Sequence, residues 1–280
     1  MKRILIAGAA SYLGTAFERY IGQWPEEYSV ETISLRGDDW MKTDFSAFDV
    51  VYQVAGIAHQ KETAENAQTY YEVNCDLAAA VAEQAKAAGV KQFVYLSSMS
   101  VYGMDTGVIT RETQPVPTSH YGKSKLRAEE RLRLLADDSF RIAILRPPMV
   151  YGKDCPGNFQ TVIKLVKRLP IFPRVRNRRS MIYVENLCAF VKLVIDRELD
   201  GWYFPQNREY AETTQIARLA AKSLGKRIWF SFLVGAAVLL LRPLSSKLRK
   251  AFGSLTYQDM EDFEFAYCAV EFEDSIRRSV

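Results

Sequence analysis

Tyr121 and Lys125 are the two residues of this sequence whose types and spacing most clearly suggest chemistry. They stand four residues apart in a segment with helical periodicity, so both side chains project from one face of a helix. An ammonium group beside a phenol favours the phenolate, and a tyrosine with an ordinary pKa of about 10 then exchanges a proton near neutral pH. The pair is a candidate general acid and base for an alcohol. Taken alone, the same spacing also occurs by chance in amphipathic helices.

A glycine turn near the start of the chain predicts a dinucleotide site. Residues 2–7 form a short apolar run, and a helical pattern through Phe17, Tyr20 and Ile21 follows the turn. Strand, glycine turn and helix in this order begin a Rossmann unit, in which the N–H groups of the helix N-terminus meet a pyrophosphate. A purely structural turn is the alternative. The loop residues expected at the cofactor are Gly8, Ser11, Tyr12, Leu13 and Gly14.

The end of the second expected strand, residues 29–35, bears on the choice of cofactor. An acid there would bind the 2′-hydroxyl of NAD, whereas a base would accommodate the 2′-phosphate of NADP. Arg36 follows the strand and favours NADP, with a solvated loop charge as the alternative. Asp44 and Phe45 are expected near the adenine. The choice between NAD and NADP stays open.

A third strand is expected over residues 49–56, because this run is apolar and ends in small side chains. Val54, Ala55 and Gly56 suit a stretch of chain that runs beneath a bound cofactor. An alanine-rich helix is expected over residues 70–88, where a glycine follows as a typical helix end.

Hydroxyl side chains follow the next expected core strand, within residues 91–103. Ligands of open α/β sheets bind at the carboxyl ends of the strands, which places Ser97, Ser98 and Ser100 where a substrate would lie. One of these serines can hydrogen-bond the reacting oxygen and assist Tyr121. Turn-forming serines are the alternative.

Composition excludes several classes of protein. The chain has 280 residues, of which 48% are hydrophobic and 25% charged, as in soluble globular proteins. A dispersed net charge of +4 gives no argument for nucleic acid as a partner. The four cysteines are far apart, with no metal-ligand spacing and no Cys-x-x-Cys, so we expect no metal site and reduced thiols in a cytoplasmic protein. The first apolar run is too short for a signal peptide.

Together these motifs resemble the extended short-chain dehydrogenase/reductase family, in its NAD-dependent nucleotide-sugar epimerase/dehydratase branch. The resemblance covers most of residues 1–191 in order. It implies an α/β fold, a Rossmann-like doubly wound parallel sheet with a smaller C-terminal substrate-binding lobe. The expected domains are residues 1–152 for NAD(P) and 153–280 for substrate, with segments around 179–204 returning to the first. The motifs that carry it are Gly8-x-x-Ser-x-x-Gly14, Asn74, and residues 49–56, 98–103, 121–129, 146–152 and 179–187.

The resemblance also implies roles for single residues. Ser98 and Tyr121 match the catalytic hydroxyl and the acid/base, and Lys125 matches the residue that also holds the nicotinamide ribose. Asn74 matches a residue that braces the site. The remaining matches are Pro148 and Val150 beside the nicotinamide, and Asn158, Phe159 and Arg179 at the substrate's diphosphate.

Two departures from the family pattern concern the cofactor, and one concerns the reaction. Ser11 replaces the usual second glycine, and the acid after the second strand is missing. Family 4,6-dehydratases carry an Asp-Glu pair directly after the catalytic hydroxyl residue, because removal of water needs a second acid/base set. Met99 and Ser100 stand there in this chain, which argues against dehydration.

Two segments of the second half carry unusual charge or hydropathy. Residues 174–179 are rich in arginine, which suits phosphate, although only Arg179 has motif support and the others are expected to be loop charges. Residues 228–241 are almost entirely apolar and too short to span a bilayer. We expect a buried helix or a dimer contact there, with weak membrane-interface contact as the alternative. A terminal helix is expected over residues 272–276.

The function implied is reversible epimerisation of a nucleotide sugar, a UDP-hexose or UDP-N-acetylhexosamine at C4, through a transient 4-keto intermediate with NAD or NADP. Reduction of a nucleotide 4-keto-sugar with NADPH is the alternative, and a non-catalytic cofactor-binding scaffold is a third. Such an enzyme is typical of polysaccharide biosynthesis. The family commonly forms homodimers, here through residues 70–88 and 121–136.

Overall fold

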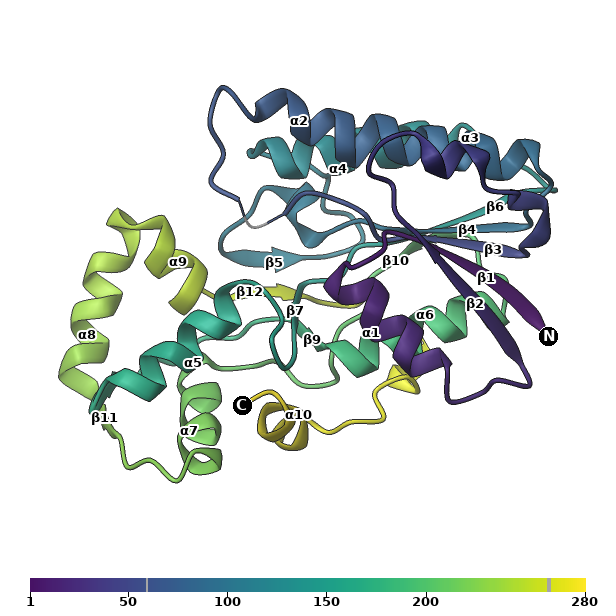
Figure 1. The fold of residues 1–280 in the computed structure, drawn as a ribbon. Coiled ribbons are helices and arrows are strands. Elements are labelled where there is room, and N and C mark those ends of the chain that lie inside the picture. The colour runs from purple at the N-terminus through teal and green to yellow at the C-terminus, as the bar shows by residue number, and fades with distance from the viewer. Residues whose placement is uncertain (59, 261–262) are drawn as a thin grey trace. The chain divides into compact units, whose positions relative to one another are not determined.

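The computed structural model describes residues 1–58, 60–260 and 263–280 (Figure 1). The chain forms two compact units, and each unit collects several stretches of sequence. Unit 1 contains residues 1–103, 114–147 and 187–205, and unit 2 contains residues 104–113, 148–186 and 206–280. The sequence predicts a boundary near residue 152, with segments around 179–204 returning to the first domain, and residues 187–205 lie in unit 1. Residues 104–113 and 148–152 are grouped with unit 2 because their contacts lie there.

Unit 1 is built on a six-stranded sheet in the order β10-β6-β4-β3-β1-β2, in which every neighbouring pair is parallel. The central strands are buried on both faces, as their continuous apolar sequences predict. This arrangement is the predicted Rossmann-like sheet, and its carboxyl ends gather the loops after each strand at one edge. The strands are β1 (Lys2–Ala7), β2 (Tyr28–Ile33), β3 (Val50–Gln53), β4 (Gln92–Leu96), β6 (Arg141–Leu145) and β10 (Gly201–Tyr203).

Helices cover both faces of this sheet, with α2, α3 and α4 on one side and α1 and α6 on the other (Figure 1). The alanines of α3 allow close packing, so that Ala78, Ala82 and Ala85 are fully buried in the same core as Phe93 of the sheet. On the opposite face Phe17 meets Tyr52 edge to face, 5.1 Å between ring centroids. The helices are α1 (Tyr12–Ile21), α2 (Ala67–Tyr71), α3 (Leu77–Ala87), α4 (His120–Arg133) and α6 (Val184–Asp196), whose first turn belongs to unit 2.

In the described part of unit 2, short parallel strands pair as β5 with β12, β7 with β9, and β8 with β11. Its strands are β5 (Gly107–Ile109), β7 (Met149–Tyr151), β8 (Ile171–Pro173), β9 (Met181–Tyr183), β11 (Trp229–Ser231) and β12 (Leu255–Tyr257). Its helices are α5 (Asn158–Arg168), α7 (Thr213–Ser223), α8 (Phe232–Leu241), α9 (Ser246–Phe252) and α10 (Phe272–Arg278). The expected terminal helix is confirmed as α10.

The apolar stretch 228–241 differs from its main expectation. It forms β11 and α8, and the interpretation as a buried helix is wrong, because Gly235 is the one buried residue of α8. A Cβ at Gly235 would lie 2.2 Å from the Arg174 carbonyl oxygen, so glycine lets the helix backbone rest against this chain segment. The contact holds α8 in place through its backbone and leaves most of its apolar side chains at the surface.

Candidate active site

The glycine turn of unit 1 has the geometry of a phosphate cradle. Gly8 has φ +141°, and a Cβ there would lie 2.8 Å from the Ala55 backbone nitrogen. A Cβ at Gly14 would lie 2.6 Å from the Ser11 hydroxyl oxygen, which accepts the Gly14 N–H at 3.0 Å and caps α1. Ala10 also has a left-handed φ of 62°, a conformation that costs energy without glycine and is typical of functional turns. These features fit a dinucleotide at the N-terminus of α1, and Tyr12 and Leu13 open that helix.

The loops after β2 and before β3 place the other expected adenosine contacts. Arg36 is exposed two residues beyond Ser34, whose hydroxyl accepts its N–H. Asp44 caps a single turn, since its carboxylate accepts from the Ser46 N–H and hydroxyl, and these bonds lower the pKa of Asp44. Phe45 is buried in the core, so its side chain serves packing.

Tyr121 lies in the first turn of α4, whose N-terminus is fixed from two directions. Ser119 accepts the Gly122 N–H at 3.1 Å, and the Glu62 carboxylate accepts the N–H groups of His120 and Tyr121 at 2.9 and 3.0 Å. The partial positive charge at the N-terminus of a helix also stabilises a carboxylate at this position. No motif identifies Glu62 in the sequence, because it lies 59 residues away in a polar loop.

The structure brings Ser98 and Tyr121 together at the carboxyl end of β4. The Ser98 hydroxyl donates to the Ser100 hydroxyl and accepts the Ser100 N–H, each at 3.1 Å. A Cβ at Gly122 would lie 2.5 Å from the Ser100 carbonyl oxygen, so α4 packs tightly against this turn. The pKa of Tyr121 is raised, because burial outweighs the opposite effect of the neighbouring Ser98 side chain.

Lys125 lies one turn further along α4 and is buried, as expected for a partner of Tyr121. Its ammonium donates to the Leu96 carbonyl oxygen at 2.8 Å and lies 4.6 Å from the centre of the Tyr95 ring. Burial lowers the pKa of Lys125 to about 8, and Glu129 acts in the opposite direction. The expected effect of Lys125 on the pKa of Tyr121 stays a prediction.

Asn74 joins this helix to the loop after β3. It lies in a single π-helical turn, Glu72–Asp76, between α2 and α3, and such turns are frequent at functional sites. Its side chain accepts the Ile57 N–H at 2.7 Å and donates to the Ile57 carbonyl and the Ser124 hydroxyl. A Cβ at Gly56 would lie 2.9 Å from the Asn74 oxygen and 3.3 Å from the Lys125 nitrogen. Gly56, Asn74 and Lys125 are therefore held in one compact arrangement.

A buried ion pair behind the site escapes sequence analysis. Arg146 and Glu129 are both buried and joined by several hydrogen bonds, and Ser97, Tyr102 and Trp202 bond to the same pair. The pair fastens α4 to β4 and β6. Its sequence signal is the position of Glu129, four residues after Lys125, and of Arg146 at the end of a strand.

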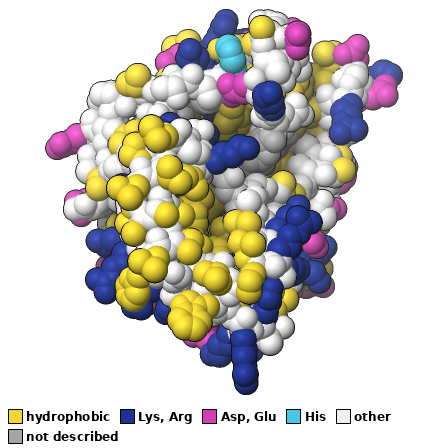
Figure 2. Space-filling view, turned by 90° about the vertical axis from the view of Figure 1, so that its left-hand side faces the viewer, with side chains coloured by type: hydrophobic (Ala, Val, Ile, Leu, Met, Phe, Trp, Pro, Cys, Tyr) yellow, Lys and Arg dark blue, Asp and Glu magenta, His cyan; other side chains and the backbone are white. Residues whose placement is uncertain are grey.

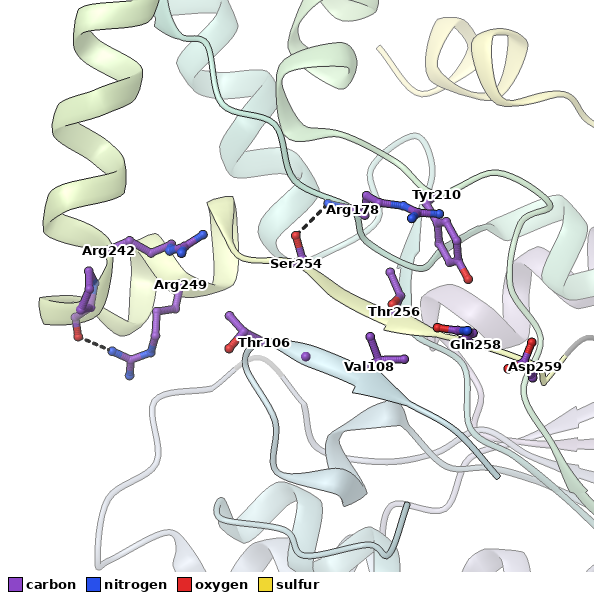
Figure 3. A pocket seen from close by; sticks show the side chains of 12 residues that line it. Thr106, Val108, Arg178, Tyr210, Arg242, Arg249, Ser254, Thr256, Gln258 and Asp259 are labelled. Atoms are coloured by element: carbon purple, nitrogen blue, oxygen red, sulfur yellow. Dashed lines mark hydrogen bonds between the residues drawn. The ribbon is translucent and has the colours of Figure 1, made fainter. Parts of the chain in front are cut away.

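Unit 2 contains a basic pocket of ≈ 770 Å³ between β5, β12 and the segment around α9 (Figure 3). The Arg178 guanidinium lies 4.5 Å from the centre of the Tyr210 ring. Arg249 pairs with Asp105 at 3.4 Å and donates to the Pro243 carbonyl at 2.8 Å. The lining residues are Thr106, Gly107, Val108, Arg178, Tyr210, Arg242, Pro243, Arg249, Ser254, Thr256, Gln258 and Asp259.

Arginines that the sequence does not single out therefore line this pocket. Arg178 is part of the arginine-rich run, where a loop charge is expected, and Arg242 and Arg249 lie outside every motif. Arginine side chains suit a diphosphate, since their planar forks donate paired hydrogen bonds.

Arg179, the residue with motif support, lies next to this pocket in sequence and is largely buried. One guanidinium nitrogen donates to the Gly253 carbonyl at 3.0 Å, while its Nε is buried without a partner among the described residues. Burial lowers the pKa of Arg179, and Asp105 acts in the opposite direction. A buried donor without an acceptor costs free energy, so this group is suited to an anionic ligand.

The other expected contacts of the second half also belong to unit 2. Asn158 begins α5, and Phe159 is buried against the Tyr151 ring, 5.1 Å between centroids, so its side chain serves packing. Pro148 precedes β7, and Val150 lies half-buried within that strand.

Fold and site together define a dinucleotide-binding α/β protein with a serine–tyrosine–lysine set at the end of β4. The model of the NAD dependent epimerase/dehydratase family matches residues 4–202. The chain belongs to this family.

Relatives cover most of the chain. It is 29% identical over 255 residues to UDP-glucose 4-epimerase of Vibrio cholerae, covering 81% of this chain and 77% of that protein. It is 27% identical over 244 residues to N-acetyl-α-D-glucosaminyl-diphospho-ditrans,octacis-undecaprenol 4-epimerase of Escherichia coli O157:H7, covering 80% and 73%. Among solved structures, UDP-glucuronic acid 4-epimerase from Bacillus cereus in complex with NAD has a TM-score of 0.76 at 20% identity, covering 99% and 97%. The predicted family and fold class are confirmed.

Proposed function

We propose that this enzyme interconverts the C4 epimers of a nucleotide sugar, with a UDP-hexose or UDP-N-acetylhexosamine as substrate and NAD or NADP as cofactor. The observation that carries the proposal is the placement of Ser98 beside Tyr121, one helical turn from a buried Lys125. The relatives that cover most of the chain are 4-epimerases of sugar diphosphate compounds, in agreement with this activity.

Tyr121 takes the proton of the C4 hydroxyl and returns it after the 4-keto-sugar has rotated to present its other face. Ser98 hydrogen-bonds the same oxygen and orients it toward the phenol. A bound nicotinamide cofactor supplies the hydride acceptor and donor, so net redox is zero. The cradle at Gly8 and the N-terminus of α1 would hold the cofactor's pyrophosphate. Lys125, being buried and charged below pH 8, holds the nicotinamide ribose through its ammonium.

The basic pocket of unit 2 supports the substrate class. Arg178, Arg242 and Arg249 line this pocket and would donate to the diphosphate. A nucleoside diphosphate needs several such donors, because both phosphate groups are negatively charged and each presents more than one acceptor oxygen.

Proton NMR of UDP-hexoses and UDP-N-acetylhexosamines incubated with the purified enzyme tests the proposal. We expect conversion between C4 epimers without added cofactor, and loss of nearly all turnover in Tyr121→Phe. Tyr203→Phe is the control, since the Tyr203 hydroxyl is exposed and donates to the Asp200 carbonyl oxygen. A normal rate in Tyr121→Phe would refute the assignment. Stoichiometric use of NADPH on a 4-keto-sugar would instead establish the reductase, which the exposed Arg36 after β2 favours.

A sugar linked through diphosphate to a polyprenol is a second candidate substrate. One relative acts on such a compound, and Arg242, which follows α8 directly, lines the basic pocket. The apolar surface of α8 therefore adjoins the proposed diphosphate site. Turnover of a polyprenyl diphosphate N-acetylhexosamine in detergent, with none of the UDP-sugars converted, would favour this substrate.

A further inference from the structure

The surface of α8 is unusual because an apolar helix is left uncovered. Leu233 and Leu240 are 85% and 79% exposed and lie seven residues apart on one face of the helix, and Leu244 in the following turn is 83% exposed. Trp229, just before the helix, is 75% exposed. Figure 2 shows hydrophobic side chains gathered on this side of the molecule, with Lys and Arg at the margins. Isolated exposed leucines are ordinary, whereas a contiguous set marks an interaction site.

The charge around this helix is one-sided. Residues 213–258, between Glu212 and Asp259, contain eight Lys and Arg residues and no Asp or Glu. The rest of the chain has 29 Lys and Arg against 33 Asp and Glu, so the excess of positive charge is confined to this stretch. Arg227, Lys247 and Lys250 are exposed within it.

The local structure keeps α8 in this position. The Ser231 hydroxyl caps the helix by accepting the Val234 N–H at 3.3 Å, and the Arg174 guanidinium lies 4.1 Å from the centre of the Phe232 ring. The backbone of α8 packs against Arg174 at Gly235, and the leucines of the helix are exposed to solvent.

We propose that α8 and the turn that follows it dock onto an anionic lipid surface, with the leucines inserted at the interface and the flanking Lys and Arg on the headgroups. An exposed apolar surface with basic residues around it suits the interface of an anionic bilayer, because the apolar groups leave water and the basic groups meet the headgroups. None of the helices among the described residues has the length and hydropathy that a membrane span requires. A second copy of the chain is a poorer occupant, since a two-fold contact would bring the two basic flanks together.

Flotation with vesicles tests the docking, using the whole enzyme. One set of vesicles is phosphatidylcholine alone, and the other is an equimolar mixture of phosphatidylcholine and phosphatidylglycerol. We expect the wild type to bind the anionic vesicles at least about tenfold more strongly, with binding that weakens as salt is added. The emission of Trp229 should shift to shorter wavelength, and Trp229→Phe should abolish that shift.

Two sets of variants separate the apolar and the charged contributions. Leu233→Gln/Leu240→Gln/Leu244→Gln should lower the partition coefficient at least about tenfold, because three apolar side chains no longer leave water. Leu134→Gln is the matched control, since Leu134 is also 85% exposed but lies in unit 1.

The charge variant is Lys247→Gln/Lys250→Gln, and its matched control removes Lys42 and Lys91, which are exposed in unit 1. Each basic group near an anionic surface contributes about fivefold, so we expect a loss of about 25-fold on anionic vesicles only.

Three results would overturn the proposal. They are no binding of the wild type to either vesicle, binding that the leucine variant leaves unchanged, and a dimer in sedimentation that the leucine variant converts to a monomer. The last result would assign the surface to self-association. Conversion of soluble UDP-sugars should be equal in the wild type and the leucine variant, so a failure of the proposed activity and a failure of docking give different readouts.

Discussion

The buried ammonium of Lys125 makes the stability of this protein depend on pH in a direction that can be calculated. Its pKa is about 8 in the folded chain, against an ordinary value of 10.5. Between these values the unfolded chain holds the proton and the folded chain does not, so the free energy of unfolding rises with pH. From pH 7 to pH 10 this single group adds about 2–3 kcal/mol to the stability of the wild type.

Lys125→Met removes the titration and keeps a side chain of similar length. At pH 7 the variant escapes the cost of burying the charge, about 3 kcal/mol, but loses a charged hydrogen bond to the Leu96 carbonyl oxygen, which offsets about 1.5–3 kcal/mol. We therefore expect the variant to be about as stable as the wild type at pH 7, and less stable by about 2–3 kcal/mol at pH 10.

Urea unfolding of both proteins at pH 7 and pH 10 measures this difference, with Lys91→Met as a control for loss of a surface lysine. The comparison is made between the two proteins at each pH, so titration of other groups cancels. A stability difference that stays the same at both pH values would show that Lys125 is not desolvated, and the reasoning about its burial would fail.

Three further outcomes follow from the site. Glu129→Gln leaves the buried guanidinium of Arg146 without its charge partner and should cost about 3–5 kcal/mol in urea unfolding, whereas replacing Arg146 by Met in the same protein should recover part of the loss. Ser98→Ala removes the hydrogen bond that lowers the pKa of Tyr121, so the pH profile of turnover should move upward and turnover should fall on the order of 10²-fold. Gly56→Ala places a Cβ 2.9 Å from a buried amide oxygen, and melting curves should show a loss of about 1–3 kcal/mol, with turnover falling as well.

The fold of unit 1 follows from the sequence because its signals are local and repeated. Apolar strands, a glycine turn and amphipathic helices alternate, and a parallel sheet is the arrangement that buries such strands on both faces. The assignment of residues 104–113 to unit 2 could not be read in this way. It depends on the pairing of β5 with β12, two short strands almost 150 residues apart that have no pattern of their own.

The site was predictable where a residue acts at a fixed distance from a motif. Ser98, Tyr121 and Lys125 lie together because β4 and the first turns of α4 are local structures with known geometry. The pocket was less accessible to sequence, since Arg178, Arg242 and Arg249 meet only through the folding of unit 2. The effect of Lys125 on the pKa of Tyr121 stays a prediction, because spacing along a helix fixes the face of a side chain but not the acceptor that its end finds.

The exposure of α8 shows why hydropathy alone cannot distinguish a buried helix from a surface helix. Both are runs of apolar residues, and a helix that is apolar on every face is usually buried. α8 contacts β8, Arg174 and α9, but Gly235 is its one buried residue, so these contacts leave most of its side chains exposed. A helix that leaves so much apolar surface exposed is expected to bind a partner that covers this surface. The concentration of basic residues on both sides, in a chain whose remainder is slightly acidic, points to an anionic surface rather than to another copy of the same positive face.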